Sequence, residues 1–199
     1  HMFLWSAQVV WSTDGTAEGT EEVWRGHSGT SAVLAASGLA WTAPRPGKSG
    51  DRVWMSDGTA AGTRIVSGDT LTFSGIRQLL RYQNSLIICG TRAGSSATLH
   101  LFDPVTGAVA SLSDAIRLPF QSFLERPAVQ LGDALVFLGA DQDLYVTRGT
   151  PESTARLSTA TAVATLTPAG PVCYFIADGS PLGRSLWVTD GTQAGTRYI

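Results

Sequence analysis

A short motif recurs along this chain at nearly constant spacing. The segment WSTDGTAEGTEEV begins at Trp11, WMSDGTAAGTRIV at Trp54 and WVTDGTQAGTRYI at Trp187. Two weaker copies, LHLFDPVTGAVASL and LYVTRGTPESTARL, lie between the second and the last. Aligned on the motif aspartate, the five copies fall 42 to 46 residues apart, at Asp14, Asp57, Asp103, Arg148 and Asp190. A period of this length indicates a structural unit that buries its apolar face only by stacking on its neighbours.

The pattern inside each unit favours strands over helices. A period of 40 to 45 residues fits a four-stranded propeller blade or a pair of helices, and only the local pattern separates the two. Apolar residues alternate or run in short stretches bounded by Gly, Pro, Asn and Asp, without a helical stripe. The predicted strands of the last two units are 126–133, 134–141, 142–148, 154–158, 162–170, 171–178, 184–190 and 196–199.

The predicted fold is therefore an all-β propeller of four-stranded blades. We expect one domain over residues 1–199 with five blades, at about 3–26, 27–68, 69–113, 114–158 and 159–199. The residues before Asp14 suffice for two strands, so the first blade is expected to lack its innermost strand. The alternative is that the chain belongs to a longer array, or that a homo-oligomer completes the ring.

Composition limits the classes of partner. The 199 residues are 43% apolar and 15% charged, with 22 glycines and a net charge of −2. A large core and many tight turns follow from this content. The charge does not provide the basic surface that nucleic acid or an anionic membrane requires, and no apolar run is long enough to cross a bilayer.

The Asp-Gly-Thr segment is predicted to be the turn between the last two strands of each unit. Asp can hydrogen-bond to the backbone ahead of it, and Gly adopts positive φ without steric cost. One acid per loop is too few for a Ca²⁺ site, so we expect a structural turn, no metal and no cofactor. The residues assigned to this turn are Asp14, Gly15, Thr16, Asp57, Gly58, Thr59, Asp190, Gly191 and Thr192.

The repeat W-x-x-DGT-x-x-GT resembles the ELWxxDGT repeat family of bacterial multi-repeat proteins. The units at Trp11, Trp54 and Trp187 match the motif, but none carries its leading Glu: Gln8 or Val9, Arg52 and Ser185 lie in that region. The resemblance implies a β-propeller-like fold and a secreted, cell-surface or periplasmic protein. His1 and Met2 have the appearance of a cloning remnant, so a signal peptide would have been removed.

The motif aromatic is expected to pack between neighbouring units. Its position reads Trp11, Trp54, His100, Tyr145 and Trp187. Large aromatic residues bury much area while a ring nitrogen or hydroxyl finds a partner at the edge. A shallow sugar-stacking pocket is the alternative interpretation of the same residues.

Residues suited to catalysis are sparse. The predicted innermost strands contain little that ionises apart from Arg81 and Asp133. His27 is expected in a loop and His100 in the packing position, and no nucleophile elbow is present. Cys89 and Cys173 lie in apolar segments typical of buried free thiols. A channel hydrolase would need two carboxylates, such as Asp133 and Asp178, facing one cleft.

A recognition surface is predicted at two tryptophans outside the motif and at a nearby basic segment. Trp41 is interpreted as the start of an irregular insertion, WTAPRPGKSGDR, and Trp24 as lying near a loop. Long connections on a rigid scaffold commonly carry binding residues. The candidate ligand-binding residues are therefore Trp24, Trp41, Arg45 and Lys48.

These observations predict a binding or assembly module, not an enzyme, that acts through protein–protein interaction in an exported bacterial protein. A multivalent lectin is the alternative, because one aromatic pocket per blade would gain affinity by avidity. A hydrolase that uses the central channel is the third possibility.

Overall fold

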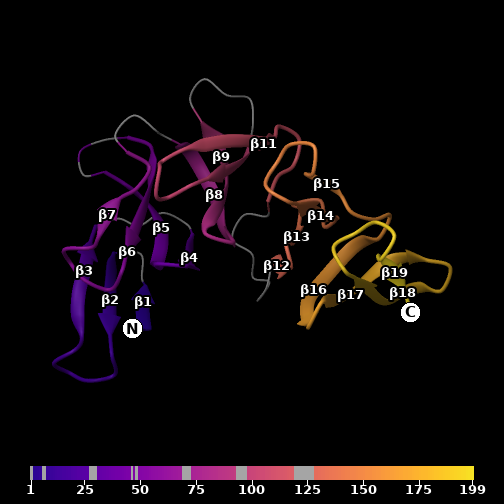
Figure 1. Ribbon diagram of the computed structural model, residues 1–199, viewed down its shortest axis with the longest axis horizontal. Coiled ribbons are helices and arrows are strands. Elements are labelled where there is room, and N and C mark those ends of the chain that lie inside the picture. The colour runs from indigo at the N-terminus through magenta and orange to yellow at the C-terminus, as the bar shows by residue number, and fades with distance from the viewer. Residues whose placement is uncertain are drawn as a thin grey trace. The chain divides into compact units, whose positions relative to one another are not determined.

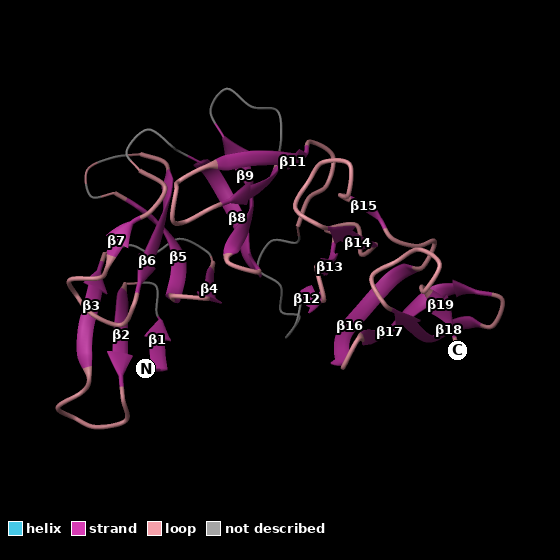
Figure 2. Cartoon of the chain, in the orientation of Figure 1, coloured by secondary structure: helices cyan, strands magenta, loops and turns pink. Residues whose placement is uncertain are grey.

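The computed structural model describes residues 2–5, 8–26, 31–45, 47, 49–68, 73–92, 98–118 and 128–199. Within these residues the chain forms 19 strands and no helix (Figure 2), which confirms the all-β prediction. Accordingly, the described residues contain no helix that meets the length and hydropathy of a membrane span. Two compact units divide the chain, residues 1–110 and 111–199. The prediction of one domain over 1–199 stays a prediction.

The first unit begins with a three-stranded antiparallel sheet. It is followed by an eight-stranded sheet that consists of two four-stranded sets joined by one bridge, Asp51 to Phe73. The strands of the three-stranded sheet are β1 (Met2–Trp5), β2 (Val9–Thr13) and β3 (Glu21–Arg25). The two sets are β4 (Ala32–Ala35), β5 (Gly38–Pro44), β6 (Asp51–Ser56) and β7 (Arg64–Ile65), then β8 (Phe73–Tyr82), β9 (Ser85–Arg92), β10 (Leu99–Phe102) and β11 (Val109–Ser113).

The second unit contains two four-stranded antiparallel sheets whose strands pair in chain order (Figure 1). The first has β12 (Ala128–Leu131), β13 (Ala134–Leu138), β14 (Leu144–Thr147) and β15 (Ala155–Arg156). The second has β16 (Thr161–Ala169), β17 (Val172–Ser180), β18 (Gly183–Thr189) and β19 (Arg197–Tyr198). These eight strands confirm those predicted for the last two repeats. The prediction succeeds there because alternating apolar residues and Gly-rich turns specify the strands locally.

One predicted loop is a strand. Trp41 does not open an irregular insertion but lies inside β5, paired with Trp54 of β6. The run from Gly38 to Pro44 is almost wholly buried, and a strand buried on both faces lacks the alternation that marks a half-exposed one. Because a Pro-rich stretch follows β5, the sequence analysis placed the start of the loop at Trp41, although the strand continues to Pro44.

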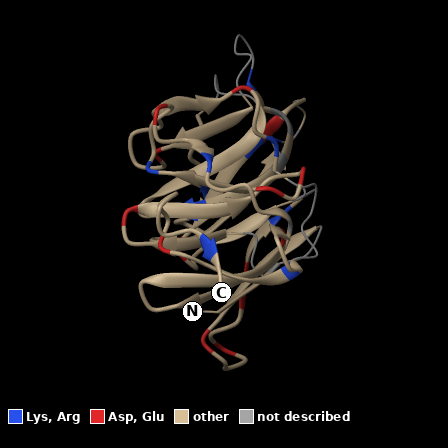
Figure 3. Cartoon of the chain, turned by 90° about the vertical axis from the view of Figure 1, so that its right-hand side faces the viewer, with Lys and Arg blue, Asp and Glu red and all other residues tan. Residues whose placement is uncertain are grey.

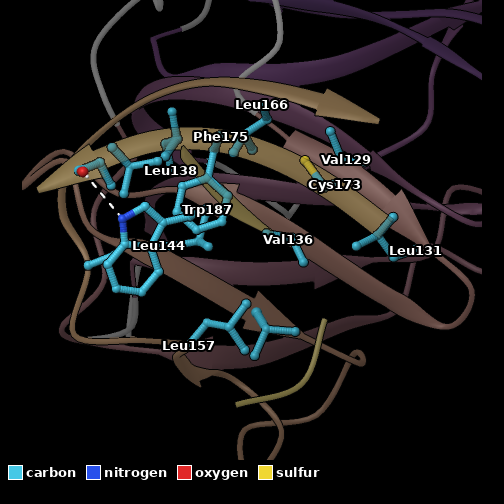
Figure 4. Packing of buried hydrophobic residues seen from close by; sticks show 14 of the residues in the cluster. Val129, Leu131, Val136, Leu138, Leu144, Leu157, Leu166, Cys173, Phe175 and Trp187 are labelled. Atoms are coloured by element: carbon cyan, nitrogen blue, oxygen red, sulfur yellow. Dashed lines mark hydrogen bonds between the residues drawn. The ribbon is translucent and has the colours of Figure 1, made fainter. Parts of the chain in front are cut away.

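Each repeat carries a cross-strand pair at the motif aromatic, and the pairs of the last four repeats contribute to the buried core. The partners are Leu4 with Trp11, Trp41 with Trp54, Ile88 with His100, Phe137 with Tyr145 and Phe175 with Trp187. Three of the pairs stack with ring centroids 5.8 to 6.2 Å apart. Such aromatic pairs contribute about 0.5–1.5 kcal/mol beyond their buried area. The second unit's core lies between its two sheets, where Phe175 and Trp187 face Leu138 and Leu144 (Figure 4).

The polar edge of the motif aromatic has a repeated partner. The indole N–H of Trp54 donates to the carbonyl of Ala43 at 3.2 Å, and that of Trp187 donates to the carbonyl of Ala177 at 3.3 Å. In the third repeat His100 Nε2 contacts the carbonyl of Gly90 at 3.1 Å. In these three repeats the aromatic position is thus a packing position whose polar ring atom has a hydrogen-bond partner, as the sequence analysis expected.

Candidate functional site

The motif turn is a closed hydrogen-bond network. Asp190 Oδ1 accepts the backbone N–H of Thr192 at 2.8 Å and its hydroxyl at 2.7 Å. The Thr192 hydroxyl in turn accepts the N–H of Gly195 at 3.0 Å, and the Thr196 hydroxyl donates to the Thr192 carbonyl at 2.6 Å. The turns at Asp14 and Asp57 repeat these contacts.

These contacts set the electrostatics of the turn. The donated hydrogen bonds hold the pKa of each motif carboxylate below its ordinary value. The Thr hydroxyl contributes most at Asp57 and Asp190, whereas the Thr16 backbone N–H contributes most at Asp14. The described residues contain no group of three acids, histidines or cysteines that could hold a metal ion. The motif Asp therefore has a complete structural role in organising its own turn.

The second glycine of the motif is required by the carboxylate. A Cβ built on Gly195 would overlap the carboxyl group of Asp190, and the same holds for Gly19 with Asp14 and for Gly62 with Asp57. The first glycine is required by backbone conformation, since Gly191 has φ of 85°. Asp and the second glycine consequently form one steric unit.

The fourth repeat replaces both members of that unit together. Arg148 stands where the other turns have Asp, and Ser153 stands where they have the second Gly. The Ser153 hydroxyl accepts the N–H of Arg148 at 3.0 Å and that of Thr150 at 3.2 Å, which supplies the acceptor that the lost carboxylate provided. The guanidinium of Arg148 instead reaches the Gly191 carbonyl at 3.2 Å and Asp133 at 3.4 Å. The exception to the motif thus connects two neighbouring turns.

The predicted recognition residues are not gathered at one surface. Trp41 is completely buried and Trp24 is 9% exposed; their rings meet edge to face at 5.7 Å within the core of β1–β6. Arg45 is exposed directly after β5, and Lys48 lies outside the described residues. The sequence signal that separates Trp41 from a loop residue is its place about twelve residues before the motif aromatic, the place that Ile88 and Phe175 hold in their repeats.

A cleft of about 480 Å³ lies in the first unit, where sequence reasoning expected no site. The segment 64–68 that includes β7 forms one wall, and the β10–β11 turn over 104–109 forms the other. That turn is rigid: Asp103 Oδ1 accepts the N–H of Val105 at 2.8 Å, and Asp103 Oδ2 accepts the Thr106 hydroxyl at 2.8 Å. The opposite wall is fixed by the N–H of Val66, which donates to the Val53 carbonyl at 2.9 Å.

The cleft is lined by two basic side chains. Arg64 and Arg92 line it, and its described lining residues include no carboxylate. A smaller hollow of about 290 Å³ shares Arg64, Pro104 and Val105 with it, and Asp57 is among the residues that line this hollow. Positive and negative groups therefore follow one another along the surface, an arrangement that suits a ligand with both charges. Elsewhere acidic and basic residues are interspersed (Figure 3).

The described residues considered for catalysis occupy structural positions. His100 is fully buried beside Phe73, and His27 lies outside the described residues. Cys89 and Cys173 are buried free thiols, and burial raises the pKa of Cys173 to about 11, so it is not a thiolate at neutral pH. Asp133 pairs with Arg148 at 3.4 Å and Asp178 with Arg184 at 3.7 Å. Among the described residues, no histidine is exposed to serve a nucleophile as base.

Comparisons with solved structures give the fold. The chain is similar to a puromycin-hydrolysing peptidase of Mycobacterium tuberculosis, with a TM-score of 0.57 and 17% identity over 98% of this chain. It is also similar to a puromycin hydrolase (TM-score 0.53, 18% identity, 91% of this chain) and to its S511A mutant complexed with PGG (0.54, 18%, 99%). The matches are to the β-propeller domain of these peptidases, so this chain has a β-propeller-like all-β fold.

The same comparisons limit what the similarity says of the whole protein. The chain spans 37%, 30% and 36% of the three matched chains, about a third of their length. No family model matches the sequence, and no curated protein sequence matches it.

The predicted function is corrected by these similarities. A protein-interaction module of an exported repeat protein, with a lectin as the alternative, was expected, whereas the structural neighbours are puromycin-hydrolysing peptidases. The error has a physical reason. Period, turns and packing aromatics describe a scaffold, and one scaffold serves unrelated functions through sites that these features do not specify.

Proposed function

We propose that this chain is a peptidase-type propeller that binds the peptide substrate of a hydrolase. The observation that carries the proposal is the fold similarity, which extends over 98% of this chain and about a third of a puromycin-hydrolysing peptidase. In this proposal the chain holds the substrate, and the groups that cleave it belong to a part of the protein outside these residues. The structural roles of His100, Cys89 and Cys173 support that division.

The cleft of the first unit is the binding site that fits this role. Arg64 and Arg92 can each receive a carboxylate with a pair of N–H donors. The neighbouring Asp57 can receive an ammonium group, since hydrogen bonds lower its pKa and keep its carboxylate ionised. A short peptide with free termini carries both of these charges. The rigid turns on either side are already organised, so little conformational entropy opposes binding.

We also infer that each of the five repeats forms one propeller blade, with the first blade lacking its innermost strand. The common cross-strand pair at the motif aromatic supports this assignment in every repeat.

The proposal is tested with fluorescently labelled tripeptides that have a free or an amidated carboxyl terminus. We expect saturable binding of the free acid by the 199-residue chain, weaker binding of the amide, and no hydrolysis of either peptide or of puromycin. Arg92→Gln and Arg64→Gln should each weaken binding of the free acid about tenfold or more, the loss of one charge-assisted pair. Arg81→Gln, on β8 and outside the cleft residues, is the matched control and should bind as the parent does.

Two results would refute this function. Equal binding of the acid and the amide, or unchanged binding by both cleft variants, would remove the cleft as the site. Turnover by the chain alone, together with labelling by a fluorophosphonate probe, would place the reacting groups inside these residues.

A further inference from the structure

A hydroxyl residue precedes the motif aspartate in each repeat where glycine follows that aspartate. The residue is Thr13, Ser56 or Thr189. Its oxygen accepts the N–H of the first motif glycine: Gly15 at 3.0 Å, Gly58 at 3.1 Å and Gly191 at 3.0 Å. In the third repeat Phe102 holds this position, and Pro104 follows Asp103 without an N–H to donate. The hydroxyl and the N–H that it accepts are therefore present or absent together.

The neighbouring hydrogen bonds orient this hydroxyl as an acceptor. The Thr196 hydroxyl donates its proton to the Thr192 carbonyl at 2.6 Å. The 2.7 Å contact between the Thr189 and Thr196 hydroxyls therefore uses the proton of Thr189. The Thr189 oxygen is left with lone pairs to accept from Gly191, and both residues are buried, so solvent has little access to this N–H.

An Asp-Gly bond in a flexible chain undergoes a reaction of its own. The glycine nitrogen loses its proton and attacks the carboxyl carbon of the Asp side chain; the new N–C bond closes a five-membered succinimide ring, and water leaves from the carboxyl group. Water then adds to either ring carbonyl and opens the ring, which gives aspartate again or isoaspartate. In isoaspartate the main chain runs through the side-chain carboxyl carbon. Glycine favours the reaction because it has no side chain to obstruct the attack.

The folded turn opposes each part of this reaction. The attacking nitrogen of Gly191 keeps its proton in the hydrogen bond to Thr189. The Asp190 carboxyl group is held through Oδ1 by the N–H and hydroxyl of Thr192, at 2.8 and 2.7 Å. Closing the ring would turn the side chain away from a staggered rotamer and out of both contacts. The Thr192 hydroxyl and N–H also lower the pKa of Asp190 and keep it ionised, the form that a nucleophile attacks least readily.

We propose that the three motif Asp-Gly bonds are latent sites of isoaspartate formation, and that the hydroxyl of Thr13, Ser56 or Thr189 keeps each of them unreactive in the folded chain. The hydroxyl is a positioning group, because it holds the glycine nitrogen and takes no part in the bond changes. All the contacts involved lie within one turn. The inference goes beyond the proposed function and does not depend on the peptide cleft.

The first test compares the folded chain with the same chain in guanidinium chloride. Both are incubated at neutral pH, and isoaspartate at each motif bond is measured by peptide mapping with mass spectrometry and by enzymatic methylation of isoaspartate. We expect each motif bond to convert about tenfold or more slowly in the folded chain, because unfolding removes the hydrogen bonds to both reacting groups. Equal rates in the two states would overturn the proposal, and this comparison requires no variant.

The second test removes the hydroxyl from one repeat at a time. Ser56→Ala should raise the rate of conversion at Asp57 about threefold to tenfold, the effect of one lost hydrogen bond, and leave the other two motif bonds unchanged. Thr189→Val should act in the same way at Asp190 alone. Ser56→Thr keeps a hydroxyl at this position and should convert as the parent does.

Thr147→Val is the matched control for lost stability. The Thr147 hydroxyl accepts the N–H of Gly149 at 3.1 Å, the same contact in the fourth repeat. Arg148 stands between them and offers no carboxyl group to attack. The variant should lose as much stability in urea unfolding as Ser56→Ala does, yet convert at Asp57 as the parent does.

Three results of the second test would overturn the proposal. The first is a parent rate at the altered repeat in both Ser56→Ala and Thr189→Val. The second is an equal acceleration at all three motif bonds in either variant, and the third is an acceleration at Asp57 in Thr147→Val as large as in Ser56→Ala. Each of them would leave the hydroxyl as a part of the turn geometry alone.

Discussion

Substitution of Gly195 by Ser tests the coupling of the motif Asp with the second glycine. The added side chain would occupy the position of the Asp190 carboxyl group, which must then move away. Asp190 loses the two hydrogen bonds that it accepts from Thr192, at 2.8 and 2.7 Å. We therefore expect the variant to be less stable than the parent.

The magnitude follows from those two contacts. A hydrogen bond contributes about 0.5–1.5 kcal/mol net to the free energy of unfolding. The lower part of that range applies here, because solvent reaches the carboxylate and can replace its partners. The loss is then about 1–2 kcal/mol, and for a chain of this length each kcal/mol lowers Tm by about 2–4 °C.

Removal of the Asp190 carboxylate should recover part of the stability that the Gly195→Ser variant loses. The fourth repeat shows the alternative network, in which the Ser153 hydroxyl accepts the N–H of Thr150 at 3.2 Å. The double substitution Asp190→Ala with Gly195→Ser should therefore be more stable than the sum of the two single changes implies. The converse pair, Ser153→Gly with Arg148→Asp, should show the same sign of coupling in the fourth repeat.

The assay is urea unfolding of the four proteins of each cycle, followed by tryptophan fluorescence. Independent sites add to within about 0.3–0.5 kcal/mol. A coupling free energy below that limit in both repeats would refute the steric explanation and leave the joint replacement of Asp and Gly without a physical cause.

Three further predictions concern the turn and the core. The motif carboxylates have a folded-state pKa below the ordinary value of 3.8, so their stabilising contribution is complete above that pH and is lost as the pH falls through the folded-state pKa. Tm should therefore be constant from about pH 7 to about pH 5 and fall below about pH 4. The triple variant Thr16→Val, Thr59→Val and Thr192→Val should show a smaller fall in Tm, and an equal fall would exclude these donors as its cause. Phe175→Ala removes a ring that is 2% exposed and stacked on Trp187, so the free energy of unfolding, measured by urea titration, should decrease by about 3–5 kcal/mol. A decrease below about 1 kcal/mol would show that the two sheets of the second unit do not share this core. Treatment with EDTA should leave Tm unchanged, because threonine donors bind Oδ1 of each motif carboxylate and the described residues offer no group of three acids, histidines or cysteines to a metal ion. A drop of many degrees would indicate a cation in the turn.

The sequence by itself predicts the repeating scaffold, because its determinants are local. The spacing of the motif gives the size of each unit, alternating apolar residues give the strands, and Asp-Gly-Thr gives the turn from a few neighbouring atoms. The packing role of Trp54 and Trp187 also follows from their recurrence at one position. In each case the responsible contacts join residues close in the chain or related by the period.

The tertiary structure alone decided features that depend on neighbours far away in the chain. The sequence places Trp41 in a loop, whereas the structure pairs it with Trp54 in the sheet. In the sequence Arg148 is only a departure from the motif, whereas in the structure its guanidinium donates to the carbonyl of Gly191, one repeat away. The cleft around Arg64 and Arg92 has no motif, since its walls come from two different repeats.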